Sequence, residues 1–96
     1  MARDKIQHIS LGLGQLVKQL GLGERLRQQR VLDEWARMVG ERIAAVSRPE
    51  RIQDGVLYVR VSSASWRMEL LFQKALILEK IATALGEDLV KDIRYI

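Results

Sequence analysis

The sequence predicts an α+β fold in which helices cover one face of a small three-stranded sheet. Asp54-Gly55, a strong hairpin signal, separates two extended runs. A long segment with helical apolar spacing follows, and then a last extended run. These segments are, in order, residues 49–53, 56–62, 64–85 and 89–96. The last run should return to the hairpin by a crossover connection, so with two helices before the hairpin the order is α-α-β-β-α-β.

Two helices are expected before the hairpin. In residues 6–20 the apolar side chains recur at steps of three and four, which predicts a helix that stops at Gly21. A second helical pattern runs over about 24–46, and Pro49 prevents its continuation. Gly40 lies near the end of this pattern, where the missing side chain would let another backbone approach closely.

The hairpin and the third helix have different apolar patterns. Alternation along the second strand places Leu57, Val59 and Val61 on an apolar sheet face and leaves the opposite face, with Val56, Tyr58 and Arg60, open. Ser62-Ser63 supplies capping hydroxyls for a helix over 64–85 that ends at Gly86. This helix has two apolar stripes, and both are expected to be buried. The stripes are Trp66, Leu70, Ile77 and Ile81, and Met68, Leu71, Ala75, Leu78 and Ala82.

Composition limits the class of protein. Residues 1–96 suit one small globular domain. Cysteine is absent, which excludes disulfide scaffolds, thiolate metal sites and cysteine nucleophiles. The N-terminus has no apolar signal region, and no apolar run is long enough to cross a membrane. We therefore expect a cytoplasmic protein.

No catalytic or cofactor motif is recognisable. His8 is the only histidine and has no partner histidine or cysteine, so a metal site is not expected. Neither the dinucleotide-binding glycine fingerprint nor a P-loop is present. The serines do not form a nucleophile-elbow pattern. The sequence therefore indicates a binding protein with no cofactor, and not an enzyme.

The net charge of +4 arises entirely in the first half of the chain. Residues 1–51 contain ten basic and six acidic groups, and 52–96 contain six of each. Eleven of the sixteen basic residues are arginine, whose planar fork suits phosphates and carboxylates. We predict a sequence-independent nucleic-acid surface formed by Arg25, Arg27, Arg30, Arg37, Arg48 and Arg51. The alternative is that these arginines only pair with the neighbouring carboxylates of Glu24, Asp33, Glu34 and Glu41.

Aromatic residues on the third helix suggest a protein interface. Trp66 begins the long apolar helix, and together with Met68 and Phe72 it is a candidate partner-binding anchor. The alternative is that Trp66 is a core residue, as we expect for Trp35.

A set of spaced residues resembles the DciA family of bacterial proteins over nearly the whole chain. The resemblance is carried by Asp33-Glu34-Trp35, Val39-Gly40, Ile43-Ala44, Pro49, residues 54–59, residues 62–66, Glu69-Leu70 and Asp92-Ile93-Arg94. It implies a fold similar to a KH domain and a role as an operator or loader of the hexameric replicative DNA helicase (DnaB type) on single-stranded DNA. A KH domain holds phosphates with a G-x-x-G loop, whereas the corresponding turn here reads Gly21-Leu22-Gly23-Glu24.

Two other functions fit the same sequence. One is a KH-like RNA-binding module, which would prefer RNA to single-stranded DNA of matching sequence. The other is a homodimeric scaffold that uses the open sheet face and the third helix, and its mass would depend on concentration without affinity for nucleic acid or helicase.

Overall fold

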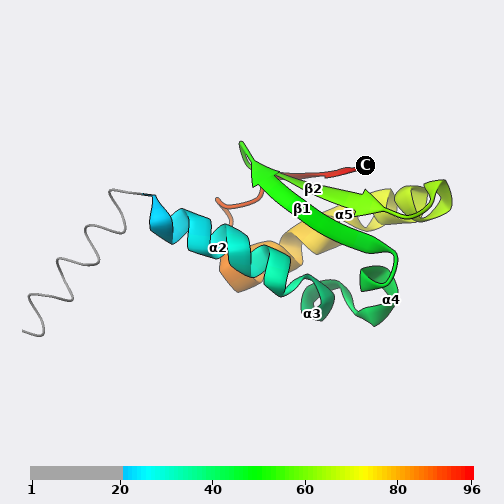
Figure 1. Ribbon diagram of the computed structural model, residues 1–96, viewed down its shortest axis with the longest axis horizontal. Coiled ribbons are helices and arrows are strands. Elements are labelled where there is room, and N and C mark those ends of the chain that lie inside the picture. Colours follow the sequence, from blue (N-terminus) through cyan, green and yellow to red (C-terminus); the bar gives the residue numbers. More distant parts are fainter. Residues whose placement is uncertain (1–20) are drawn as a thin grey trace, which may run out of the picture.

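The computed structural model describes residues 21–96. The helix expected over 6–20 lies outside the described residues. The described elements are α2 (Leu22–Asp33), α3 (Trp35–Val39), α4 (Glu41–Ala44), β1 (Ser47–Gln53), β2 (Val56–Val61), α5 (Ala64–Leu85) and β3 (Asp92–Tyr95). The helices pack on one face of the three-stranded sheet, which confirms the predicted α+β class (Figure 1). Among the described helices, none is long and apolar enough to cross a membrane.

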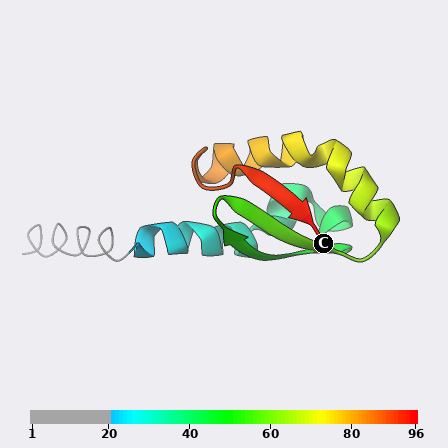
Figure 2. The ribbon, with the colours of Figure 1, turned by 90° about the horizontal axis from the view of Figure 1, so that it is seen from above.

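The sheet has the order β1-β2-β3, with β1 antiparallel and β3 parallel to the central strand β2 (Figure 2). Asp54 and Gly55 both have positive φ, 53° and 77°, as the predicted type I′ hairpin turn requires. β1 begins two residues earlier than expected. β3 is shorter than the predicted run, because Leu89 and Val90 precede the strand and are buried in the core.

A β-bulge in β1 decides which side chains face the helices. Pro49 pairs with Val59 and Arg51 pairs with Tyr58, which leaves Glu50 as an extra residue. The extra residue shifts the inward–outward alternation of β1 by one position, so that Ile52 instead of Arg51 packs against the core. Both Glu50 and Arg51 consequently lie on the sheet face that carries no helix.

The core lies between the inner sheet face and one stripe of α5. Leu57 and Val59 are fully buried, as the alternation predicts, against Leu70, Ile77 and Ile81 of α5. α5 has the predicted bounds: Ser63 Oγ accepts a hydrogen bond from Trp66 N at 3.2 Å, and Gly86 ends the helix. The prediction that the second stripe is buried is wrong for Met68, Leu71 and Ala75, which are exposed, while Leu78 and Ala82 are half-buried.

The prediction of one continuous helix over 24–46 is also wrong, because two breaks divide it into α2, α3 and α4. Glu34 leaves the helical conformation at φ −99° and ψ 6°, and Gly40 adopts φ 91° and ψ 161°. Residues with a side chain rarely adopt the Gly40 conformation. The expected close approach of another backbone is absent, since nothing described lies within 4 Å of a Cβ built there. Gly40 is needed for its backbone angles.

Gly40→Ala should therefore lower the free energy of unfolding by about 1–3 kcal/mol, because alanine is strained at this φ and ψ. Chemical denaturation followed by circular dichroism measures the change. The control is Ala84→Gly in α5, an exposed helical position where the reverse exchange costs about 0.5–1 kcal/mol. A Gly40→Ala variant as stable as the parent would contradict the positive φ.

Tyr95 in β3 has a buried hydroxyl with no hydrogen-bond partner among the residues the structure describes. Burial raises the pKa of Tyr95 to about 12, above the value of about 10 in an unfolded chain. The folded state therefore loses stability as the pH rises from about 10 to 12, where the unfolded chain gives up this proton first. We expect the melting temperature to fall less steeply over this pH range in Tyr95→Phe than in the parent. Equal slopes would show that Tyr95 ionises freely in the folded protein.

Candidate functional site

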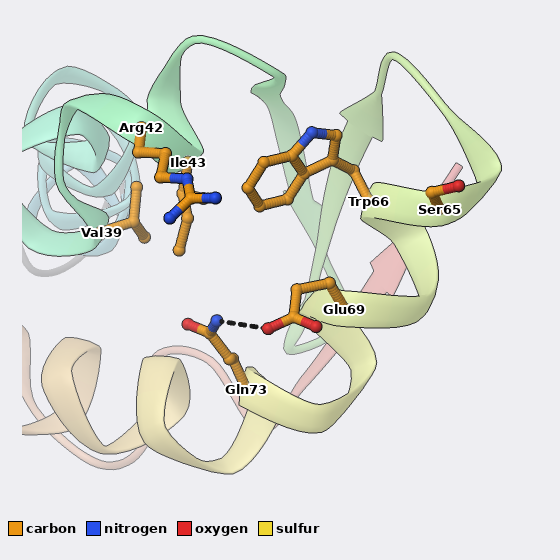
Figure 3. Close-up of a pocket in the computed structure, with 7 residues that line it drawn as sticks. All are labelled: Val39, Arg42, Ile43, Ser65, Trp66, Glu69 and Gln73. Atoms are coloured by element: carbon orange, nitrogen blue, oxygen red, sulfur yellow. Dashed lines mark hydrogen bonds between the residues drawn. The ribbon is translucent and has the colours of Figure 1, made fainter.

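A groove of about 560 Å³ separates α3 and α4 from the first turns of α5 (Figure 3). The Ser63 cap fixes the start of α5 and hence the place of Trp66, while the turn at Gly40 carries α4 to the opposite wall. The lining residues are Val39, Arg42, Ile43, Ser65, Trp66, Glu69 and Gln73. The sequence pattern did not predict this groove, because it depends on the break between α3 and α4.

The groove combines an apolar surface with charged groups. Trp66 is half-buried, and the guanidinium carbon of Arg42 lies 5.6 Å from the centre of its ring, a cation–π distance. Gln73 Nε2 donates a hydrogen bond to Glu69 Oε1 at 3.3 Å on the same helix. Within residues 21–96, no group of three or more histidine, cysteine or acidic residues could hold a metal ion. From a protein partner, the groove suits a side chain that is mostly apolar and has a polar end.

The predicted partner residues lie on two sides of α5. Trp66 faces the groove, whereas the side chains of Met68 and Phe72 are 59% and 80% exposed. At 100° per residue, Met68 lies 200° around the helix from Trp66. The outward side, which we call the α5 apolar face, consists of Met68, Leu71, Phe72 and Leu76. Contiguous exposed apolar side chains of this kind are typical of protein interaction sites.

Of the predicted arginines on the helices, two have ion-pair partners. Arg27 donates to Asp88 Oδ1 at 2.8 Å and to the Leu85 carbonyl at 3.2 Å, and so ties α2 to the end of α5. This hydrogen bond lowers the pKa of the Asp88 carboxyl. Arg30 pairs with Glu34 at 3.3 Å, as the ion-pair alternative predicts.

The other two predicted helix arginines, Arg25 and Arg37, are exposed and have no ion pair within the described part of the chain. Both therefore remain available for a polyanion. They lie on α2 and α3, apart from the other two predicted arginines, which lie in β1.

Arg48 and Arg51 lie on the exposed sheet face and not beside the helix arginines. In the strand register, Arg48 is opposite Arg60, and Arg51 is opposite Tyr58. Tyr58 is in turn the neighbour of Arg94 in β3. The nucleic-acid prediction from sequence omitted Arg60, Arg94 and Tyr58. The alternation in β2 already placed Tyr58 and Arg60 on the open face, but only the parallel pairing of β3 adds Arg94.

Comparison with protein families assigns the chain. The model of the family described as "Dna[CI] antecedent, DciA" matches residues 8–95. The chain belongs to the DciA family. The resemblance drawn from the spaced residues is thereby confirmed, and the fold described above is that of a DciA family member.

Curated relatives agree with the DciA assignment. A UPF0232 protein of Rhodococcus jostii is 38% identical over 79 residues, which are 82% of this chain and 42% of the relative. A UPF0232 protein of Mycobacterium tuberculosis is 38% identical over 80 residues, 83% of this chain and 43% of the relative. A UPF0232 protein of Mycobacterium leprae is 35% identical over 79 residues, 82% of this chain and 42% of the relative. The chain thus spans less than half the length of these relatives.

Proposed function

We propose that this DciA family member binds the hexameric replicative DNA helicase of DnaB type and assists its placement on single-stranded DNA. The observation that carries the proposal is the family match over residues 8–95. The role is one of binding, in a bacterial cytoplasm, with no cofactor and no reaction catalysed by this chain.

Two surfaces of the described chain, on different sides of α5, support a protein partner. The groove offers Trp66 beside Arg42, and an aromatic residue that is half-buried loses little freedom when a partner covers it. The α5 apolar face offers Phe72 at 80% exposure. Burial of apolar surface by a helicase domain would supply the main favourable term of association. Trp66, Met68 and Phe72 are therefore the proposed helicase contacts.

The DNA part of the role is assigned to surface arginines. Exposed guanidinium groups that lack a carboxylate partner can contact phosphates without reading the sequence. Such binding weakens with salt in proportion to the number of phosphates neutralised. It would hold the strand weakly while the helicase closes around it.

The experiment mixes the purified protein with the replicative helicase of the same bacterium. Association is measured by light scattering coupled to size exclusion, and loading by the rate of helicase capture on single-stranded DNA. We expect a complex and faster loading. No association at micromolar concentrations and moderate salt would contradict the proposal.

The same samples test the two alternatives. Tighter binding to RNA than to single-stranded DNA of matching sequence would favour an RNA-binding module. A mass that grows with concentration, without helicase or nucleic-acid binding, would favour a homodimeric scaffold, for which the α5 apolar face is the available surface.

A further inference from the structure

The face of the sheet that carries no helix has an unusual set of side chains, which we call the arginine face. It consists of Arg48, Arg51, Tyr58, Arg60 and Arg94, with Glu50 at the bulge. All four arginines are exposed, and Tyr58 is half-exposed at the centre. They come from all three strands, so the sheet pairing alone creates this surface.

Sheet stability does not explain this arrangement. Arg48 and Arg60 lie directly opposite each other on antiparallel strands, and like charges in this position destabilise a sheet. Glu50 partly compensates, because it accepts hydrogen bonds from Arg60, which lowers the pKa of the Glu50 carboxyl. Glu50 has a second basic neighbour, since its Oε2 lies 3.8 Å from Arg51 Nη1. One carboxylate thus faces four guanidinium groups, and the surface keeps a net charge of +3.

Arg48 and Arg94 have no ion pair within residues 21–96. The neighbouring charged groups at the sheet edge do not supply one, since Asp92 pairs with Lys74 of α5 at 2.6 Å. Arg48 and Arg94 lie on the two outer strands, on either side of Tyr58. An anionic chain that crosses β2 would meet both.

Tyr58 provides a stacking surface between these charges. The guanidinium carbon of Arg51 lies 4.1 Å from the centre of the Tyr58 ring, so the two planar groups are in contact. Nucleic-acid bases stack on aromatic rings and on arginine guanidinium planes, and these contacts tolerate any sequence. The bases of a duplex are already stacked on one another, whereas those of a single strand are free to stack here.

We propose that the arginine face binds single-stranded DNA, with a base stacked on the Tyr58–Arg51 pair and phosphates contacted by Arg48, Arg60 and Arg94. This inference rests on the proposed function for the choice of DNA over RNA. It moves the main nucleic-acid contact from the helix arginines to the sheet. It also leaves the groove and the α5 apolar face free, so that DNA and a protein partner can be held together.

The test measures binding of a labelled oligothymidine strand by fluorescence anisotropy at several salt concentrations. Arg48→Gln with Arg94→Gln should weaken binding about tenfold and reduce the salt slope by about 1.4, at roughly 0.7 per phosphate on a single strand. The matched control is Arg25→Gln with Arg37→Gln, which removes the same charge from α2 and α3. Because the inference makes Arg25 and Arg37 secondary contacts, this pair should weaken binding by a smaller factor than the sheet pair. A larger loss in the control pair than in the sheet pair would overturn the inference.

A second variant tests stacking separately from charge. Tyr58→Leu keeps an apolar, strand-compatible side chain and should weaken binding at least fivefold with an unchanged salt slope. Circular dichroism and thermal melting confirm that each variant is folded. Affinity for oligothymidine equal to that of the parent would show that no base stacks on Tyr58, and would overturn the inference.

Three further measurements distinguish a failure of this inference from a failure of the proposed function. A duplex of the same length should bind more weakly than the single strand, and tenfold tighter binding of oligouridine would overturn the assignment to DNA. All variants are also tested for helicase association, which should not change. If the parent protein binds helicase but no single strand, the arginine face is refuted and the helicase role stands.

Discussion

Trp35→Ala is expected to lower the free energy of unfolding by about 3–5 kcal/mol. The Trp35 side chain is only 3% exposed and lies in the core at the start of α3. Its Nε1 donates to Ser47 Oγ at 2.9 Å, and Ser47 Oγ donates to the Ile43 carbonyl at 2.6 Å. Truncation removes the packing and leaves the buried Ser47 hydroxyl with one partner fewer. The free energy of unfolding of a folded protein is about 5–15 kcal/mol in total, so the fold of this variant should be only marginally stable at 37 °C.

Denaturant titration followed by circular dichroism gives the size of this effect. Trp35→Phe keeps a buried ring but loses the N–H donor, and should cost about 1–3 kcal/mol. The control is Arg37→Ala, two residues along α3 and exposed, which should stay within about 0.5 kcal/mol of the parent. If Trp35→Ala lowers the free energy of unfolding by less than about 1 kcal/mol, Trp35 and its hydrogen bond to Ser47 do not hold the core together.

The second large effect is expected at the proposed helicase contacts. Phe72→Ala should weaken helicase association at least tenfold, because a buried aromatic anchor is typically worth 2 kcal/mol or more. Since Phe72 is 80% exposed in the free protein, its truncation should leave the free energy of unfolding within about 0.5 kcal/mol. Loss of association therefore reports a lost contact and not a lost fold.

Trp66→Leu extends this test to the groove, because leucine keeps apolar contact with the core while it removes the indole ring beside Arg42. The matched control is Leu26→Ala, since Leu26 is an exposed apolar residue on α2, away from both surfaces. Unchanged helicase affinity in Phe72→Ala and Trp66→Leu together would move the contact elsewhere. A loss of self-association instead would identify the surface as a homodimer interface.

Local sequence patterns predicted the hairpin and α5 closely. Asp54-Gly55 favours a type I′ turn, because this turn requires positive φ at both central residues and Asp-Gly is one of the pairs that adopt it readily. Both residues have positive φ in the structure. Ser63 and Gly86 mark the ends of α5 through short-range capping. Alternation along β2 also identified its buried side chains correctly.

The breaks around α3 could not be predicted in the same way. Helical spacing continues through Glu34 and Gly40, so the pattern alone favours one helix. Trp35 must reach Ser47, and the chain must then turn into β1 across the sheet, which a straight helix does not allow. The exposure of Leu71 was equally unpredictable from the sequence, because an apolar stripe has the same pattern whether this chain or another molecule covers it.

The sequence by itself determined the hairpin and the long helix, because each rests on spacings of a few residues. The order of the elements along the chain indicated the α+β class, and motif residues spread over most of the chain indicated the family. Tertiary structure alone decided the groove beside Trp66 and the arginine face. Arg48, Tyr58 and Arg94 lie far apart in sequence and become neighbours only through strand pairing. The bulge at Glu50 places Arg51 on the same sheet face as Tyr58, where the two side chains are in contact. Surfaces of this kind arise from long-range register, which no local pattern contains.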